Sequence, residues 1–246
     1  MTLRAALVLI LALAFAAAPL FSGFNGFDPA LYPLPQEDPP VQPAGWAFSI
    51  WGLIYLWLIL HGAWGHFRRR DDPAWGRMRL PLIAALAAGV PWLWVAERSP
   101  LAATALIWVM LVAAIAALLR TTTATDRWVL APPVALLAGW LTAASSVSVG
   151  LFLAGWGLTG EMTAAWIALA LAVLVAAPLQ LRLRRAPEYG LAVAWALVAV
   201  AARNHGTHGT LTLAAAALAA IMLLFAYAAL SGERMVRRDW TGSSPA

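Results

Sequence analysis

The chain contains no cysteine, no lysine and few charged residues of either sign. The absence of cysteine excludes disulfides, thiolate catalysis and cysteine-ligated metals, which leaves four histidines as the candidate soft-donor ligands of a metal. Charged residues make up 11% of the chain and hydrophobic residues 63%, against roughly 25% and 45–50% in soluble domains. The composition therefore predicts an integral membrane protein, and the exclusive use of arginine with abundant alanine and leucine indicates a GC-rich, bacterial genome.

Apolar runs recur along the chain, and most approach the roughly 20 residues that cross a hydrocarbon core of about 30 Å. They predict an all-α, polytopic transmembrane helix bundle of about eight spans. The expected spans cover residues 5–22, 46–66, 80–96, 101–119, 129–153, 162–181, 188–202 and 210–230. The seventh is short for a full crossing, so we expect it to thin the bilayer locally or to pack inside the bundle.

The arginines predict the orientation of these spans, because basic residues near span ends are retained on the cytoplasmic side. If every span crosses, 14 of the 16 arginines lie on one side. Arg98 and Arg203 lie on the other side, whose loops carry Asp28, Glu37, Asp38, Glu97 and Glu161. The larger group comprises Arg4, Arg68, Arg69, Arg70, Arg77, Arg79, Arg120, Arg127, Arg182, Arg184, Arg185, Arg234, Arg237 and Arg238. The pattern predicts a multi-pass protein of the bacterial inner membrane with both termini in the cytoplasm.

Alternatively, the first span is a cleaved secretory signal, since Arg4 precedes an apolar stretch with small residues near its end.

The scarcity of charge inside the spans also bears on function. Ion-coupled carriers place acidic or basic groups at mid-membrane, so the near absence of such groups disfavours ion-coupled transport. Hydrolysis needs an activated nucleophile with a base, and the spans offer no serine and histidine pair or carboxylate dyad. We therefore expect no enzyme activity. The sequence pI of about 10.7 does not indicate nucleic acid binding, because the arginines cluster at span ends rather than on one soluble face.

Tryptophan is abundant, and 12 of the 14 tryptophans lie between Trp46 and Trp166. Several of them lie in the second span, which follows a proline-rich, acidic loop at residues 23–44 that is long enough to fold over the mouth of the bundle. Trp51 and Tyr55 are four residues apart and share a helix face. Such rings either anchor a helix at the lipid headgroups or line a binding pocket.

Three histidines raise the question of a metal or haem ligand. His205 and His208 lie in a short outside loop with no carboxylate or cysteine nearby, which favours an incidental role. His61 lies inside the second span between Trp57 and Trp64, where it either approaches a haem iron or is a packed, hydrogen-bonded side chain. The second interpretation is favoured, and we predict no metal site.

The start of the second span resembles the first helix of the TspO/MBR family, the tryptophan-rich sensory proteins related to the mitochondrial translocator protein. The matching residues are Pro43, Trp46, Phe48, Trp51 and Tyr55. The chain departs from the family pattern because the two tryptophans are one residue closer and an internal proline is missing. If one helix ran through both tryptophans, this deletion would rotate Trp46 by about 100° relative to Trp51, so Trp46 is also interpreted as an interfacial anchor.

Residues 86–94 are similar to the second helix of the family, with Trp92 and Trp94 near the end and Gly89 where asparagine is usual. Gly89 and Pro91 predict a kink in this helix.

Residues 139–148 resemble the fourth helix of the family, in which an aromatic residue precedes a small, polar face. Here Trp140 is the aromatic residue, and Ser145 and Ser148 belong to the polar face. Their hydroxyls either bond across to a neighbouring helix or bond back to the preceding turn.

The resemblance covers residues 43–182 and implies three parts. These are an N-terminal helix with the proline-rich loop at 1–42, a five-helix TspO/MBR-like core at 43–182, and two further helices with a cytoplasmic tail at 183–246. The resemblance also implies a sensory or receptor protein that binds a flat hydrophobic ligand, either a tetrapyrrole such as protoporphyrin IX or haem, or a sterol-like lipid. No cofactor is required by this interpretation.

The ligand-binding residues expected from the resemblance are Trp46, Phe48, Trp51, Tyr55, Trp92, Trp94, Trp140, Ser145 and Ser148. Expected partners are membrane lipids and a hydrophobic small molecule, without nucleic acid, and a homodimer is one option for assembly. The alternatives are a transporter for lipophilic molecules, in which the three additional spans move, and a membrane protein that degrades porphyrins.

Overall fold

The computed structural model describes residues 2–24, 26–122 and 126–242. The side chains of Thr2 and of residues 232–242, among them Arg234, Arg237 and Arg238, lie outside the described part. The elements are α1 (Thr2–Ala17), η1 (Ala18–Phe21), η2 (Pro29–Leu31), η3 (Gly45–Ser49), α2 (Ile50–Phe67), α3 (Pro73–Gly89), α4 (Trp92–Ala96), α5 (Pro100–Leu119), α6 (Pro132–Gly155), α7 (Glu161–Arg182), α8 (Pro187–Asn204) and α9 (Gly209–Gly242). These ranges contain helices and no strand, which confirms the all-α fold.

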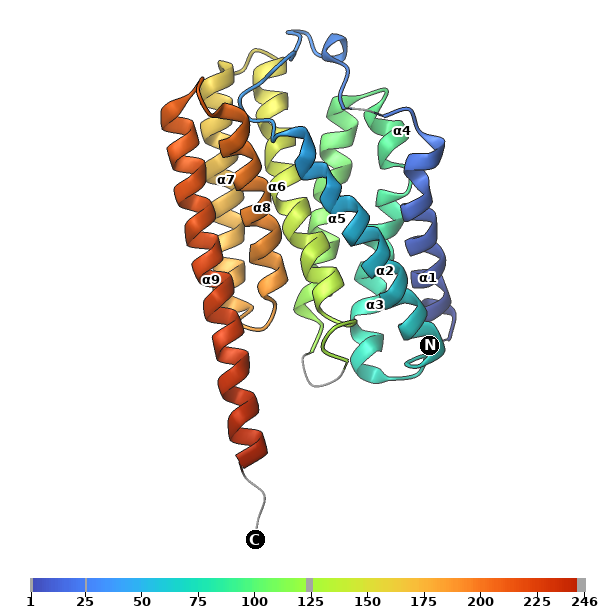
Figure 1. Ribbon diagram of the computed structural model, residues 1–246. Helices are drawn as coiled ribbons and strands as arrows, with labels where there is room; N and C mark the ends of the chain where they lie inside the picture. Colours follow the sequence, from blue (N-terminus) through green and yellow to red (C-terminus); the bar gives the residue numbers. More distant parts are fainter. Residues whose placement is uncertain (1, 25, 123–125, 243–246) are drawn as a thin grey trace.

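The helices run up and down in one bundle whose two ends carry different loops (Figure 1). The start of α1, the end of α9 and the starts of α3, α6 and α8 lie at one end. We call it the arginine end because the described arginines of the larger group lie there. The segment at residues 22–44, which we call the lid, lies at the opposite end with Arg98 and Arg203. This arrangement is the one expected if every predicted span crosses.

Each expected span corresponds to one helix or to two consecutive helices. Within the described residues, six segments are long and apolar enough to cross a membrane, namely Leu3–Phe21, Gly45–Phe67, Pro100–Leu119, Pro132–Gly155, Glu161–Arg182 and Gly209–Ser231. The expected spans at 80–96 and 188–202 correspond to the α3–α4 pair and to α8, which are not among these six. The chain is therefore a multi-pass membrane protein built as a polytopic helical bundle.

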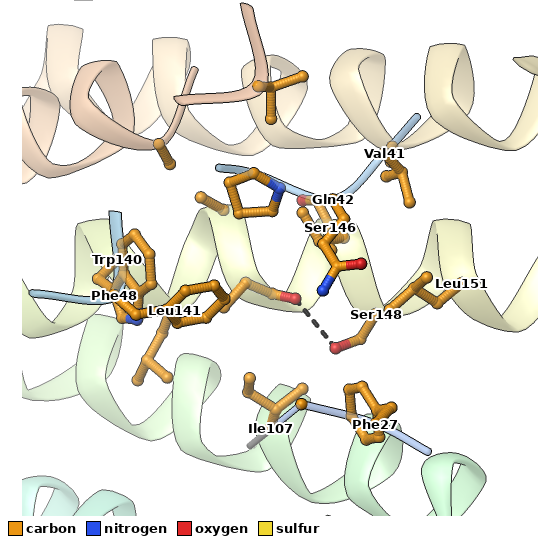
Figure 2. Close-up of a pocket in the computed structure, with 18 of the residues that line it drawn as sticks. Phe27, Val41, Gln42, Phe48, Ile107, Trp140, Leu141, Ser146, Ser148 and Leu151 are labelled. Carbon is orange, nitrogen blue, oxygen red and sulfur yellow. Dashed lines mark hydrogen bonds between the residues drawn. The ribbon is translucent and has the colours of Figure 1, made fainter. Parts of the chain in front are cut away.

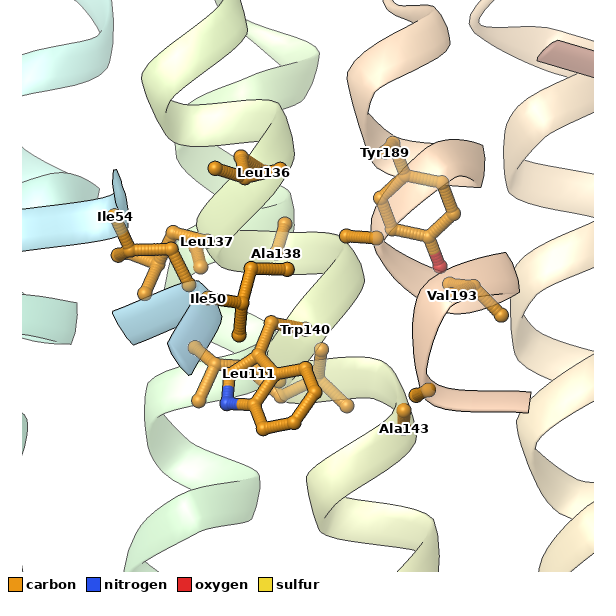
Figure 3. Packing of buried hydrophobic residues seen from close by; sticks show 14 of the residues in the cluster. Ile50, Ile54, Leu111, Leu136, Leu137, Ala138, Trp140, Ala143, Tyr189 and Val193 are labelled. Carbon is orange, nitrogen blue, oxygen red and sulfur yellow. The ribbon is translucent and has the colours of Figure 1, made fainter. Parts of the chain in front are cut away.

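Helix α6 lies at the centre of the bundle, because 72% of its apolar segment is buried, whereas the other five segments are 28–39% buried. It packs along α5, α7 and α8, and α2 crosses it. Close contact with α8 depends on Gly139, where an added Cβ would lie 2.3 Å from the Tyr189 carbonyl oxygen. The Thr142 and Tyr189 hydroxyls are 2.9 Å apart in the same interface, and Figure 3 shows Tyr189 beside the buried residues of α6.

The kink that Gly89 and Pro91 predict is present. Helix α3 ends at Gly89 and α4 begins at Trp92, since proline has no N–H to continue the ladder of α3. Gly89 also lies against α1, where an added Cβ would come within 2.7 Å of the Phe15 ring. The ring of Phe15 therefore occupies the space that a side chain at position 89 would need.

Two arginines, Arg79 and Arg185, bond to the carbonyl ends of helices at the arginine end of the bundle. The Arg79 guanidinium is 2% exposed and donates to the carbonyl oxygens of Gly65, Arg69 and Arg70, at 3.1, 2.6 and 2.6 Å. Gly65 lies in the last turn of α2, whose carbonyl groups have no partner within the helix. Arg185 likewise donates to carbonyl groups at the end of α5, including that of Thr121. Each cation thus satisfies the negative end of a helix dipole.

Asp126 and Arg127, which precede α6, form ion pairs with neighbouring parts of the bundle. The Asp126 carboxylate accepts two hydrogen bonds from Arg69, at 2.7 and 3.1 Å, and one from the Trp75 indole, at 3.0 Å. Burial alone would raise the pKa of this carboxyl, but the bonds from Arg69 and Trp75 outweigh burial and hold the pKa below its usual value. Arg127 pairs with Glu188 at 3.0 Å, which joins this segment to the start of α8.

Candidate functional site

A cavity of about 740 Å³ lies beneath the lid. Its walls come from α1, α2, the α3–α4 break, α5, α6, α7 and α8, and lid residues cover it. Pockets for small molecules typically occupy about 300–1,000 Å³, so the cavity has the size of a ligand site. The expectation that residues 23–44 fold over the mouth of the bundle matches this arrangement.

The inner wall of the cavity is built from aromatic rings of α1, α2 and α6. Trp51 and Tyr55 are stacked, with ring centroids 5.3 Å apart and planes 18° from parallel. The Phe15 ring stands edge-on to both, at 5.7 and 5.2 Å, and Trp140 stands edge-on to Trp51 at 6.1 Å. Phe48 packs against Trp140 at 5.8 Å. Such ring pairs contribute about 0.5–1.5 kcal/mol each beyond area burial, so the wall is held in place before any ligand enters.

The first part of the lid packs on the α3–α4 break. Phe24 and Phe27 are edge-on to the Trp92 ring, at 5.6 and 6.0 Å. The Trp92 indole N–H donates to the Ala103 carbonyl oxygen of α5 at 3.0 Å, which fixes the ring. Phe24, Phe27 and Trp92 all line the cavity, so this contact closes it on the side of α4.

The second part of the lid is attached to α8. The Ala44 N–H donates to the Ala199 carbonyl oxygen at 3.1 Å, and the Asn204 side-chain amide donates to the Pro40 carbonyl oxygen at 2.9 Å. An ion pair joins Arg203 to Asp38.

The same part of the lid reaches the end of α6. The Leu34 N–H donates to the Gly155 carbonyl oxygen at 2.8 Å. The Tyr32 ring fills the space beside Gly155, where an added Cβ would lie 2.2 Å from the ring, and it meets Trp156 edge-on at 5.6 Å. Burial raises the pKa of the Tyr32 phenol, so this side chain is neutral near pH 7.

The polar groups on the α6 side of the cavity are two serines and a lid glutamine (Figure 2). The Ser146 and Ser148 hydroxyls donate to the carbonyl oxygens of Thr142 and Ala144 in their own helix, at 2.8 and 3.0 Å. Figure 2 shows the Gln42 side chain directed toward Ser148. Both serines therefore use their protons within α6 and present oxygen lone pairs to the cavity.

The model of the family described as TSPO-like protein matches residues 34–230. The chain belongs to the TSPO-like family. The resemblance seen between Pro43 and Tyr55 is thereby confirmed. The match continues past residue 182 through α8 and into α9, and it leaves α1 outside. No curated protein and no solved structure matches the chain.

Six of the nine residues predicted to bind ligand line the cavity of this TSPO-like protein. They are Phe48, Trp51, Tyr55, Trp92, Trp140 and Ser148. Their ligand-binding role stays a prediction, but segments as far apart in sequence as α2 and α6 bring them to one space. The spacing of Trp51 and Tyr55 on one helix face explains why these two were recognisable.

The other three predicted residues lie outside the cavity. Trp46 belongs to η3 rather than to α2, packs edge-on to Trp195 at 4.8 Å and is 46% exposed, a placement that suits an interfacial anchor. The Trp94 indole donates to the Phe21 carbonyl oxygen at 3.1 Å and so holds the end of η1. The Ser145 hydroxyl is fully buried and points to the Ile107 carbonyl oxygen of α5 at 3.4 Å.

Several residues of the cavity carried no signal in the sequence. Phe15 lies in α1, which was interpreted as an addition to the core, and no local pattern links it to Trp51. Met110 on α5 and Arg203 at the end of α8 also line the cavity. The proline-rich composition of the lid predicted its position, but not that Gln42 would face the serines.

The histidines lie away from the cavity. His61 is 1% exposed, its Nδ1 is 2.7 Å from the Val129 carbonyl oxygen, and its ring packs on Trp75 at 4.8 Å. This is the packed, hydrogen-bonded arrangement that the sequence favoured. His205 and His208 lie in the turn between α8 and α9. Among the described residues, no group of three or more side chains is arranged to hold a metal ion.

Proposed function

We propose that this TSPO-like membrane protein is a receptor or sensor that binds a flat hydrophobic ligand beneath the lid. The candidate classes are tetrapyrroles, such as protoporphyrin IX or haem, and sterol-like lipids. The observation that carries the proposal is the stacked Trp51 and Tyr55 pair, framed by Phe15 and Trp140, in a cavity of about 740 Å³.

The chemistry of the inner wall supports a flat and mainly apolar ligand. Aromatic rings offer wide contact faces with few rotatable bonds, so they gain contact area at a small cost in entropy. Burial of apolar ligand surface contributes about 25 cal/mol per Å². The polar groups lie toward the lid and on α6, where they can fix the orientation of the ligand. We propose binding without turnover.

The experiment is a titration of the purified protein with protoporphyrin IX, followed through the absorption band of the porphyrin. The double variant Trp51→Ala, Trp140→Ala removes one member of the stacked pair and the ring at right angles to it. We expect saturable binding that weakens about tenfold or more in the variant, since each lost ring contact removes roughly 1 kcal/mol.

The matched control is Trp46→Ala, Trp166→Ala, which also removes two indoles but from exposed positions outside the cavity. The control should keep the affinity of the wild type. Equal affinities in the cavity variant and the wild type would refute the proposed site.

Two further assays separate binding from the alternative functions. A transporter would carry the ligand into proteoliposomes, whereas a receptor binds it without net flux. A porphyrin-degrading protein would consume the ligand under illumination and release a product. Either result would replace the receptor proposal with that activity.

We further propose that both termini face the cytoplasm of a bacterial inner membrane and that the lid faces outward. The concentration of arginines at the end opposite the lid supports this orientation.

A further inference from the structure

The charges around the cavity lie at its lid end and sum to one negative charge. The charged residues among those that line it are Glu37 and Asp38 of the lid and Arg203 of α8. Arg203 forms an ion pair with Asp38, so its charge is already matched. Glu37 is left as an acidic group at the mouth without a cation of its own among the residues that line the cavity.

The remaining polar groups of the cavity are neutral. The two serine hydroxyls of α6 bond to their own helix and offer lone pairs, and Gln42 carries both a donor and an acceptor. The Gln36 amide donates to the Leu34 carbonyl oxygen at 3.1 Å within the lid. Hydroxyl, carbonyl or ester groups fit such a surface, because they need hydrogen bonds and no counter-charge.

We propose that the cavity selects a neutral, flat amphiphile over a tetrapyrrole with free carboxylates. This inference rests on the proposed function and narrows its ligand class. A tetrapyrrole with two carboxylates loses binding free energy in either orientation within the cavity. With the acidic edge toward the lid, the carboxylates face Glu37 while Arg203 is engaged. With that edge inward, they lie against Phe15, Trp51 and Trp140. The Trp140 indole N–H has no hydrogen-bond partner among the described residues and offers one donor there, but no cation of the lining offsets the burial of two charges, which is strongly unfavourable.

Protoporphyrin IX and its dimethyl ester provide the test, because they share one ring and differ in charge. Both are titrated into the same detergent preparation at low ionic strength, and the ratio of the two affinities is compared between proteins. Comparison of ratios cancels the partition of each compound into detergent. We expect the ester to bind more tightly to the wild type and the gap to shrink as salt is added.

Two substitutions at the mouth should shift this ratio toward the acid. Glu37→Gln removes the unmatched charge and leaves the ion pair of Arg203 intact. Asp38→Asn frees Arg203 to meet a carboxylate. In each variant we expect the acid to gain about three- to tenfold relative to the ester, a moderate effect because both carboxylates are exposed to solvent. The control is Glu161→Gln, which removes a negative charge at the same end of the bundle but outside the cavity, and which should leave the ratio unchanged.

The outcomes distinguish the inference from the function on which it rests. Saturable binding of both compounds, with the same affinity ratio in Glu37→Gln, Asp38→Asn and wild type, would overturn the charge selection and leave the receptor proposal standing. Failure of both compounds to bind saturably would overturn the proposed function and the selection together.

Discussion

Arg79→Ala should lower the free energy of unfolding by about 2–4 kcal/mol, since hydrogen bonds to a charged group are each worth about 1.5–3 kcal/mol. The guanidinium donates to the carbonyl oxygens of Gly65 in the last turn of α2 and of Arg69 and Arg70 just beyond it, and Arg79 is only 2% exposed. Alanine removes all three of these hydrogen bonds, although the Arg69 carbonyl oxygen still accepts from the Asp72 N–H, and it removes the cation that balances the helix dipole. The loss should appear as a lower midpoint of thermal unfolding in detergent.

The control for this prediction is Arg77→Ala, two residues away on the exposed side of α3. It removes the same charge from the same end of the bundle and should change stability by less than about 0.5 kcal/mol. Arg79→Lys should fall between the two, because an ammonium cannot reproduce the planar fork of the guanidinium. Equal stability of Arg77→Ala and Arg79→Ala would show that the three hydrogen bonds contribute nothing.

Gly139→Ala should destabilise the bundle by about 1–3 kcal/mol, the usual cost of an added methyl group in a packed interior. The new Cβ would lie 2.3 Å from the Tyr189 carbonyl oxygen and 2.9 Å from the Ala192 Cβ. The first of these atoms belongs to the backbone of α8, so a side-chain rotation cannot relieve the contact. Helices α6 and α8 would have to separate, and Thr142 would lose its hydrogen bond to Tyr189.

Gly52→Ala, in helix α2, should have the opposite effect on stability. Gly52 lies in α2 with no heavy atom within 4 Å of an added Cβ, so alanine should stabilise α2 by about 0.5–1 kcal/mol through its better helix propensity. The two substitutions add the same atoms and should differ in sign. A Gly139→Ala protein that unfolds at the same temperature as Gly52→Ala would contradict the close packing of α6 on α8.

The positions of the helices were predictable because the length of an apolar run sets the length of a membrane span. The kink at Gly89 and Pro91 was also predictable from local chemistry. The start of α2 was not predictable in this way. Residues 45–49 form the 3₁₀ helix η3, because long-range hydrogen bonds hold this segment on α8. One of them runs from the Trp195 indole N–H to the Ala47 carbonyl oxygen, at 2.9 Å. Sequence spacing alone therefore placed Trp46 on a helix that begins after it.

The candidate site was predictable where the signal was local. Trp51 and Tyr55 face one way because of helix periodicity, and both line the cavity. Phe15 could not be found in this way, since its contact with Gly89 depends on how α1 packs against α3. The serines of α6 left two interpretations open, and the structure contains both, with Ser148 bonded to its own helix and Ser145 directed to α5.

Three of the hydrogen bonds that attach the lid to the bundle use the main chain of the lid. The bonds at Leu34, Pro40 and Ala44 use backbone atoms of the lid, so they do not depend on which side chains the lid carries there. The inner wall differs, because Trp140 and Leu141 belong both to the cavity and to the buried core of α6. Exchange of side chains such as Glu37 and Gln42 can therefore retune ligand preference without disturbing the bundle. Substitutions in the lid can therefore change ligand specificity, in evolution or by engineering, at a small cost in the stability of the bundle.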